Sequence, residues 1–379
     1  MRNYKIVIGS SSFFDKALDE VYSITEKNNI KLLSFLELIR IFDAQKQSDI
    51  ADTVKTLVLY IRNNDYNGIV NSAHDRLGSL IEDITYDDAL ILVHNPPRVL
   101  YEYLRDKHSR DLITLEEKRE DYSIQRKPEK FKENVLRISE SIIGQNYAIN
   151  EISKSLWYLI TVQRKKPYVI MLYGNSSLGK TELVREIAEH FFEGKVLEKH
   201  LSMFKNNNYS DYFFGEEPNR RSMGFDLLER TSNLIFLDEL DKCPEFFYSA
   251  FYTLFDNVEF RDATYDVDIS GAIIILTSNF LSEAEIKNQL GLPIYYRIDK
   301  FIRFDDFSPS VIHEITLREI ESRKAEFTNT ISSEQVYEVV SKRICTKGEN
   351  ARTIKFKIQQ VIEEMLFCDV EKSDIITGE

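Results

Sequence analysis

The sequence predicts an α/β protein with a small N-terminal α/β domain, a larger module in which helices sandwich a parallel sheet, and a C-terminal helical lid. Three observations predict this fold. Short apolar runs alternate with amphipathic segments, a glycine-bounded turn joins a buried strand to a helix, and the last part of the chain contains only helical patterns. The 379 residues are enough for two or three domains.

Composition excludes several classes of protein. The 49 Lys and Arg residues against 62 Asp and Glu give a net charge of −13, which disfavours contact with nucleic acid phosphates. Two local basic patches, Arg220 with Arg221 and residues 126–132, leave contact with nucleic acid as an alternative. Apolar runs fall short of the roughly 20 residues of a membrane span. Three widely spaced cysteines and an N-terminus unlike a signal peptide favour a cytoplasmic protein, with neither nucleic acid nor a membrane as partner.

Residues 1–108 alternate strand and helix patterns, which favours a small domain with a mainly parallel sheet. The two prolines after Asn95 suit a helix start. The predicted strands are 5–8, 30–33 and 89–93, and the predicted helices are 14–27, 53–62 and 99–105. Residues 109–138 are dense in mixed charge and lack an apolar stripe, so we interpret them as a linker with some helix.

Two further features of the sequence are weak functional signals. The turn 9–12, Gly-Ser-Ser-Ser, follows the first strand and could bind a phosphate, but no Gly-Lys pair closes it, so a plain turn is favoured. The six histidines of the chain lack metal-ligand spacing, and His74, His94 and His313 are predicted to be surface or core residues.

The strongest functional signal is the turn that follows the apolar strand 168–173. Its sequence, GNSSLGKT, fits the GxxxxGK[ST] pattern, and an amphipathic helix follows over 182–192. In such a turn the backbone N–H groups surround a β-phosphate, Lys180 neutralises charge on the β- and γ-phosphates, and Thr181 takes a magnesium position. The predicted nucleotide-binding residues of the turn are Gly174, Asn175, Ser176, Ser177, Leu178, Gly179, Lys180 and Thr181.

Two further apolar strands end in polar residues. Strand 233–237 runs into Asp238, which could hold the magnesium ion partly through water, and Glu239, which could orient and deprotonate an attacking water. Strand 272–276 ends shortly before Asn279, whose amide could reach the γ-phosphate or that water. Each signal alone is also typical of an ordinary strand end or turn. Their place beyond a phosphate-binding turn favours the functional interpretation.

With these three strand ends in order, residues 139–367 resemble the AAA+ ATPases, specifically the second ATPase module of the Clp-type unfoldases and disaggregases. Residues 142–145, Ile-Ile-Gly-Gln, are similar to the family's opening segment, which implies that Ile143 lines the adenine pocket. Residues 351–354, Ala-Arg-Thr-Ile, resemble the sensor-2 helix start, which implies a catalytic role for Arg352. The resemblance implies ATP and Mg²⁺ as cofactors. The implied ATPase subdomains are the large subdomain, 139–307, and the small helical lid, 308–379.

Residues 296–299, Tyr-Arg-Ile-Asp, resemble the family's Arg-Ile-Asp box. The resemblance implies that Arg297 reaches the nucleotide of a neighbouring subunit, where a guanidinium can raise the hydrolysis rate by about three to five decades. A subunit alone should then bind ATP and hydrolyse it poorly. A surface salt bridge to Asp299 or Glu314 is the alternative interpretation of Arg297, and Arg303 is the nearest rival for its role.

Residues 210–216 match the interval in which the family carries an aromatic pore loop that grips a polypeptide. Tyr212, Phe213 and Phe214 form an apolar cluster there, which implies that they contact substrate. The family carries one aromatic, a small aliphatic residue and a glycine, whereas three aromatics precede Gly215 here. As alternatives, Phe213 and Phe214 could pack under the sheet, or the charged stretch that follows could dock a partner.

The resemblance implies an ATP-hydrolysing ring, a hexamer of this chain, that remodels or unfolds a protein client chosen by the N-terminal domain. The first alternative is an ATP-gated assembly switch or scaffold that recruits an effector, for example in bacterial stress or phage defence. The unusual N-terminal domain and the altered aromatic segment favour it. A nucleic-acid remodeller is a further alternative, against which the net charge counts.

Overall fold

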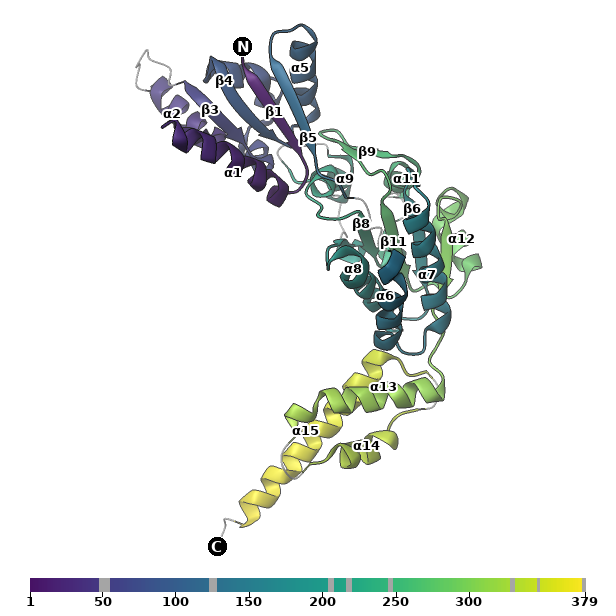
Figure 1. The fold of residues 1–379 in the computed structure, drawn as a ribbon. Helices are drawn as coiled ribbons and strands as arrows, with labels where there is room; N and C mark the ends of the chain where they lie inside the picture. The colour runs from purple at the N-terminus through teal and green to yellow at the C-terminus, as the bar shows by residue number, and fades with distance from the viewer. Residues whose placement is uncertain are drawn as a thin grey trace.

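The computed structural model describes residues 1–47, 55–122, 128–203, 208–215, 220–244, 248–327, 331–345 and 348–376. Figure 1 shows three successive parts: an N-terminal sheet with its helices, a central sheet covered by helices on both faces, and a C-terminal group of helices at the far end of the molecule. The chain therefore has the α/β architecture that its sequence predicts.

The N-terminal sheet has five strands in the order β2-β3-β4-β1-β5, and all of its paired neighbours are parallel. The strands are β1 (Asn3–Ile8), β2 (Leu32–Ser34), β3 (Thr56–Ile61), β4 (Thr85–His94) and β5 (Thr114–Arg119). The helices are α1 (Ser11–Lys27), α2 (Phe35–Gln47), α3 (Asn71–His74), α4 (Leu77–Asp83) and α5 (Arg98–Ser109).

Local chemistry explains two of these helix starts. Ser10 precedes α1 in an extended conformation, and its side chain accepts a hydrogen bond from the backbone N–H of Phe13. Pro97 directly precedes α5, so the predicted proline-led helix start is confirmed. The predicted strands 5–8 and 89–93 are confirmed within β1 and β4.

Two predictions for this part of the chain are wrong. Residues 53–62 were expected to be helical, but Thr56–Ile61 form the strand β3. Apolar residues on both faces of β3 are buried, as in an inner parallel strand, and their spacing resembles that of a helix. The linker prediction for 109–138 is wrong because β5 pairs with β1, although nearly all of its residues are exposed. Charged side chains are typical of an edge strand, and here they made the segment resemble a linker.

The central sheet has the order β12-β6-β11-β8-β7, again with parallel neighbours. The strands are β6 (Tyr168–Tyr173), β7 (Leu197–His200), β8 (Leu234–Asp238), β11 (Ile273–Ser278) and β12 (Lys300–Arg303), with a separate hairpin of β9 (Glu259–Arg261) and β10 (Asp266–Asp268). The helices are α6 (Pro128–Ser141), α7 (Asn146–Thr161), α8 (Lys180–Phe192), α9 (Asn208–Phe214), α10 (Met223–Leu228), α11 (Tyr248–Asp256) and α12 (Glu283–Tyr295).

Helices on both faces of this sheet bury two separate cores. Along β6, Ile170 and Leu172 belong to one core, whereas Val169 and Met171 belong to the other, as the two-residue period of a strand requires. The second half of the predicted linker belongs here, since α6 packs on α7 and α8, with the Phe131 ring 5.0 Å from that of Trp157. The charged appearance of α6 comes from its solvent-facing side.

The C-terminal part contains the helices α13 (Pro309–Ser322), α14 (Ser333–Ser341) and α15 (Ala351–Ile376), which confirms the helical patterns predicted there. Figure 1 shows them as a lobe beyond the central sheet. The backbone N–H of Ala351, at the start of α15, donates to the Ser177 carbonyl (3.1 Å), so the lobe meets the glycine-bounded turn. None of the helices in the described ranges combines the length and the apolar character needed to cross a bilayer.

Candidate functional site

The turn between β6 and α8 follows a path that needs glycine. Gly174 has φ +138°, and a Cβ at this position would collide with the backbone carbonyl of Phe304. Gly179 has φ +100° and caps the N-terminus of α8. Ser177, between them, is also left-handed, with φ +59°. The turn therefore wraps around the start of α8, where unpaired backbone N–H groups favour an anion.

Lys180 lies inside this turn and is only 6% exposed. Its Nζ donates to the carbonyl oxygens of Gly174 (2.8 Å) and Asn175 (2.7 Å) and lies 3.4 Å from Asn279 Oδ1. Burial lowers the pKa of Lys180 to about 8, against the opposing effect of nearby carboxylates. A buried ammonium held only by neutral oxygens is a group that an anionic phosphate would stabilise.

The carboxyl ends of β6, β11 and β8 lie side by side, so the predicted strand-end residues meet. Asp238 is 8% exposed, accepts a short hydrogen bond from the Thr277 hydroxyl, and lies 3.2 Å from His200 Nδ1. Glu239 adopts a left-handed conformation, with φ +61°, and its backbone N–H donates to the same Thr277 hydroxyl (3.0 Å). Thr277 thus fixes the backbone and side-chain geometry of this acidic pair.

Sequence reasoning missed Asp241 and His200. The Asp241 carboxylate accepts from the backbone N–H (3.1 Å) and from Nδ2 (3.4 Å) of Asn279, so it turns the Asn279 oxygen toward Lys180. A third acidic residue just beyond Glu239 was the available signal for Asp241. No local pattern marks His200, because its partners Glu198 and Asp238 come from two strands.

These groups line one cavity of about 540 Å³. The lining residues from the turn and α8 are Ser176, Ser177, Gly179, Lys180, Thr181, Glu182 and Arg185. The other strand ends contribute His200, Asp238, Glu239, Thr277, Ser278 and Asn279, and α15 contributes Ala351, Arg352 and Lys355. The structure thus brings together most of the predicted site, including Arg352 from the lid. A hydroxyl at Thr181 and a carboxylate at Asp238 are oxygen donors of the kind that Mg²⁺ prefers.

Some predicted residues lie beside this cavity and not in its lining. Leu178 is buried in the core, and Asn175 donates to Asp306 (2.7 Å). Ile143 lies outside the cavity lining, although its neighbour Gln145 donates to the carbonyls of Leu178 (3.3 Å) and Asp305 (2.9 Å). The opening segment therefore contacts the turn between β6 and α8 through Gln145.

Arg297 is also absent from the cavity lining. Its Nε forms a short ion pair with Asp256, its Nη1 donates to the Pro293 carbonyl (2.6 Å), and its guanidinium carbon lies 4.5 Å from the centre of the Tyr252 ring. The alternative partner Asp299 is instead paired with Arg164 (2.8 Å). The guanidinium is therefore held away from the cavity at the strand ends of its own chain.

The aromatic segment differs from the prediction. Residues 208–214 form α9, in which Phe213 is 1% exposed and packs against Phe251, with ring centres 5.4 Å apart. The Tyr212 hydroxyl donates to Asp226 (2.5 Å). Assigning substrate contact to Tyr212 and Phe213 is therefore wrong for this conformation, because consecutive helical aromatics cannot all face solvent. Phe214 is 41% exposed. Residues 216–219, which belong to the charged stretch offered as a docking loop, lie outside the described residues.

Comparisons with known proteins agree with this geometry. Residues 165–333 match the family model described as AAA domain (Cdc48 subfamily). The chaperone protein ClpB of Clostridium perfringens is 22% identical over 359 residues, covering 84% of this chain and 41% of that protein. The human mitochondrial disaggregase is 26% identical over 172 residues, covering 41% of this chain and 24% of that protein. The chain thus spans less than half the length of these relatives.

A solved structure has the same fold over nearly the whole chain. It is described as a closed-state reconstruction of Hsp104 with ATPγS and FITC casein, and it matches with a TM-score of 0.56 and 15% identity, covering 98% of this chain and 89% of that one. At this identity the match shows the fold. Taken with the family model and the ClpB relatives, it confirms the predicted resemblance to Clp-type AAA+ proteins: residues 165–333 match the AAA domain family, and the chain has the fold of the Hsp104 structure.

Proposed function

We propose that this protein hydrolyses ATP and, as a ring of identical subunits, uses the energy to remodel a protein client. One observation carries the proposal: the glycine-bounded turn, the acidic strand end and Asn279 meet in a single cavity whose lining also includes Arg352 of the helical lid. Nucleotide binding alone would not need a second carboxylate at that strand end, whereas hydrolysis needs a base for water.

Each side chain has a distinct task in this proposal. Lys180 leaves the carbonyls of Gly174 and Asn175 and binds phosphate oxygens, which replaces neutral partners by charged ones. Thr181 and Asp238 would hold Mg²⁺, which neutralises charge on the transferred phosphoryl group. Glu239 accepts the proton of the attacking water, and Asn279, oriented by Asp241, holds that water or the γ-phosphate.

The proposed ring assembly is argued from the position of Arg297. Because the guanidinium lies outside its own nucleotide cavity, we propose that it completes the cavity of a neighbouring copy in a hexamer. To reach a phosphate it would exchange Asp256 for a more highly charged partner.

A protein client is proposed from the named relatives. ClpB is called a chaperone, and the Hsp104 structure was solved with casein. We propose that the N-terminal domain recognises the client and that Phe214, the exposed member of the aromatic segment, contacts it. Fluorescently labelled casein is a suitable first probe.

The test uses Glu239→Gln in the full chain. This variant should bind ATP with ordinary affinity, assemble, retain labelled casein and lose about two to three decades of turnover. Turnover equal to that of the unaltered protein would remove Glu239 as the base. Phe214→Ala should keep its ATPase activity but lose casein unfolding, and Phe367→Ala, which removes another exposed aromatic, is the matched control.

The second candidate is an ATP-gated assembly switch that recruits an effector. The burial of Phe213 and the hydrogen bond of Tyr212 favour it, because they leave fewer aromatic groups to grip a polypeptide. Under this alternative, Phe214→Ala would leave every ATP-dependent property unchanged, and no labelled substrate would be unfolded even by an active ring.

A further inference from the structure

The carboxyl edge of the N-terminal sheet gathers hydrogen-bond donors from three strand ends. Residues 9–11 follow β1, Asn63 follows β3, and His94 with Asn95 ends β4. In open parallel sheets this edge is where ligands bind. The notable group at this edge is a carboxylate from another part of the chain, that of Glu229, just after α10 of the ATPase module.

Glu229 accepts hydrogen bonds with both of its carboxylate oxygens. Oε2 accepts from the backbone N–H (2.9 Å) and the hydroxyl (2.7 Å) of Ser11. Oε1 accepts from Asn63 Nδ2 (2.8 Å), lies 3.4 Å from Asn95 Nδ2, and is 3.7 Å from His94 Nε2. We call Ser11, Asn63, His94 and Asn95 the Glu229 socket.

The socket is built from fixed, buried groups. Asn63 and Asn95 are each 1% exposed, and His94 is fully buried. The His94 ring stacks on Phe14 with ring centres 4.5 Å apart, and Nε2 lies 2.9 Å from the Gly9 carbonyl. Burial lowers the pKa of His94, whose Nε2 faces the Gly9 carbonyl and lies beyond hydrogen-bond distance of the carboxylate. The four groups that donate to Glu229 are the N–H and hydroxyl of Ser11 and the side-chain amides of Asn63 and Asn95, all neutral, so the carboxylate is satisfied without a cation.

The position of Glu229 is not explained by its own helix. A carboxylate at the C-terminal end of a helix faces the negative end of the helix dipole, which disfavours it. At Ser11 it faces the N-terminus of α1, a helix of 17 residues whose first N–H groups lack intrahelical partners. The favourable contacts of this side chain therefore lie across the domain boundary.

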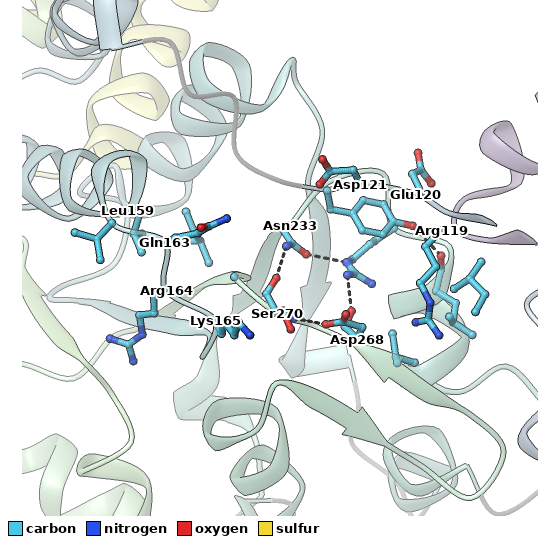
Figure 2. Close-up of a pocket in the computed structure, with 18 residues that line it drawn as sticks. Arg119, Glu120, Asp121, Leu159, Gln163, Arg164, Lys165, Asn233, Asp268 and Ser270 are labelled. Atoms are coloured by element: carbon cyan, nitrogen blue, oxygen red, sulfur yellow. Dashed lines mark hydrogen bonds between the residues drawn. The ribbon is translucent and has the colours of Figure 1, made fainter. Parts of the chain in front are cut away.

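Polar contacts also cross this boundary and border open space, beside the apolar contact of Ile8 with the core of the ATPase module. Arg98 on α5 pairs with Asp266 (2.6 Å), and its backbone N–H donates to the Thr264 carbonyl (2.8 Å). Clefts of about 410 Å³ and about 700 Å³ lie between the two parts. Figure 2 shows the smaller cleft, with Arg119 and Glu120 on one side and residues 163–165 on the other. Interfaces of this kind permit relative motion of domains.

We propose that the Glu229 socket is an oxyanion-binding site of the N-terminal domain, and that its ligand in this chain is the Glu229 carboxylate, which reversibly holds the domain against the ATPase module. The ligand class is a single carboxylate or a similar small oxyanion. The proposal does not depend on ATP hydrolysis.

The first test is Glu229→Ala in the full chain, read by hydrogen exchange at the Ser11 amide and by small-angle scattering. Because the first amides of a helix lack intrahelical partners, Ser11 exchange should become about tenfold faster or more. The maximum dimension of the molecule should increase as the domain is released. Glu259→Ala is the matched control, since Glu259 lines the larger cleft but pairs with exposed Arg261.

Chemical rescue tests the socket itself. Formate added to Glu229→Ala should restore slow exchange at Ser11 in a saturable manner, while chloride at equal ionic strength should not. Formate should have no effect on the unaltered protein, whose socket is occupied. A released Glu229→Ala protein that formate leaves unchanged would overturn the oxyanion site, and unaltered scattering of the variant would overturn the role of Glu229 in holding the domain.

Ser11→Asp provides an independent test if Glu229→Ala fails to fold. A carboxylate in the first turn of α1 favours that helix, so amides of β1 and β4 should remain protected. The same carboxylate repels Glu229, so the domain should be released at low salt and partly recover as salt screens the repulsion. Scattering identical to that of the unaltered protein would contradict the proposal.

Discussion

Both sheets of this protein have five strands with parallel neighbours, and in both a glycine–serine turn leads from a buried strand into a helix. After β6 the turn contains Lys180 and faces a cavity of about 540 Å³. After β1 the turn lacks a lysine, and Ser11 binds the carboxylate of Glu229. The same topology thus presents one open edge and one occupied edge.

This difference between the two sheets indicates that the charge of the hydrogen-bond donors at the carboxyl edge of a sheet selects the ligand that binds there. A nucleotide phosphate chain brings several negative charges, and the cationic groups near the ATPase edge, Lys180, Arg352 and Lys355, suit it. The hydroxyl and amide donors of the Glu229 socket suit one carboxylate. The predictions below test this contrast, beginning with the largest expected effect.

Arg297→Ala should lower ATP turnover by about three decades or more and leave the dissociation constant for ATP nearly unchanged, because the guanidinium acts on a neighbouring cavity. Mixing with Lys180→Ala subunits, which keep Arg297 but cannot bind ATP, should restore part of the turnover. Arg303→Ala is the control, since Arg303 is exposed and pairs with Asp305. Equal losses for both variants would leave the assignment of Arg297 unsupported.

Lys180→Ala should weaken ATP binding by about 100-fold or more, because it removes the buried cation that meets the phosphates. Calorimetric titration of the full chain measures the change. Lys195→Ala is the matched control, because this exposed lysine beyond α8 pairs with Glu193. An unchanged ATP affinity in Lys180→Ala would contradict the proposed difference between the charged donors of the ATPase edge and the neutral donors of the Glu229 socket.

ATP affinity should fall above about pH 8. In the free protein, burial lowers the pKa of Lys180 from its usual 10.5 to about 8, so the ammonium loses its proton in that range, whereas bound phosphate retains it. Binding therefore takes up a proton, and affinity should decrease by up to about tenfold per pH unit between these values. Lys180→Arg should bind with a flat profile over this range, because its guanidinium stays charged. Titrations in buffers of different ionisation enthalpy would measure the proton uptake directly.

Asp241→Asn should lower turnover by several-fold at unchanged ATP affinity, because Asn279 loses the charged acceptor that orients its amide. Lys242→Ala removes another partner of Asp241 without touching Asn279 and should have little effect. Steady-state kinetics separate the two outcomes. A loss of ATP affinity in Asp241→Asn, with turnover unchanged, would show that the carboxylate acts on binding.

The sequence predicts those parts of the fold in which local pattern and burial agree. The strand before Gly174 and the strand before Asp238 are continuous apolar runs that end in polar groups, so both the strands and the approximate place of the site could be predicted. The strand β3 was expected to be a helix, because apolar residues on both of its faces are buried. The edge strand β5 was expected to be part of a linker, because its residues are mostly charged.

The unpredicted parts depend on partners that are distant in sequence. Phe213 is buried by Phe251 on α11, and Glu229 meets Ser11 and Asn63, which lie 218 and 166 positions away. Neither the periodicity of apolar residues nor the composition indicates which residues distant in sequence come into contact. Asp241 is the intermediate case, since a third acidic residue near the strand end was visible but its hydrogen bonds to Asn279 were not.

The most direct test of the whole account is ATP turnover per subunit measured over a wide range of protein concentration, with the assembly state recorded at each point. If one copy supplies the turn and the carboxylates and its neighbour supplies Arg297, turnover per subunit should rise steeply as the chain assembles and vanish in dilute monomers. Monomers that hydrolyse ATP as fast as the assembly would contradict a nucleotide site shared between two copies.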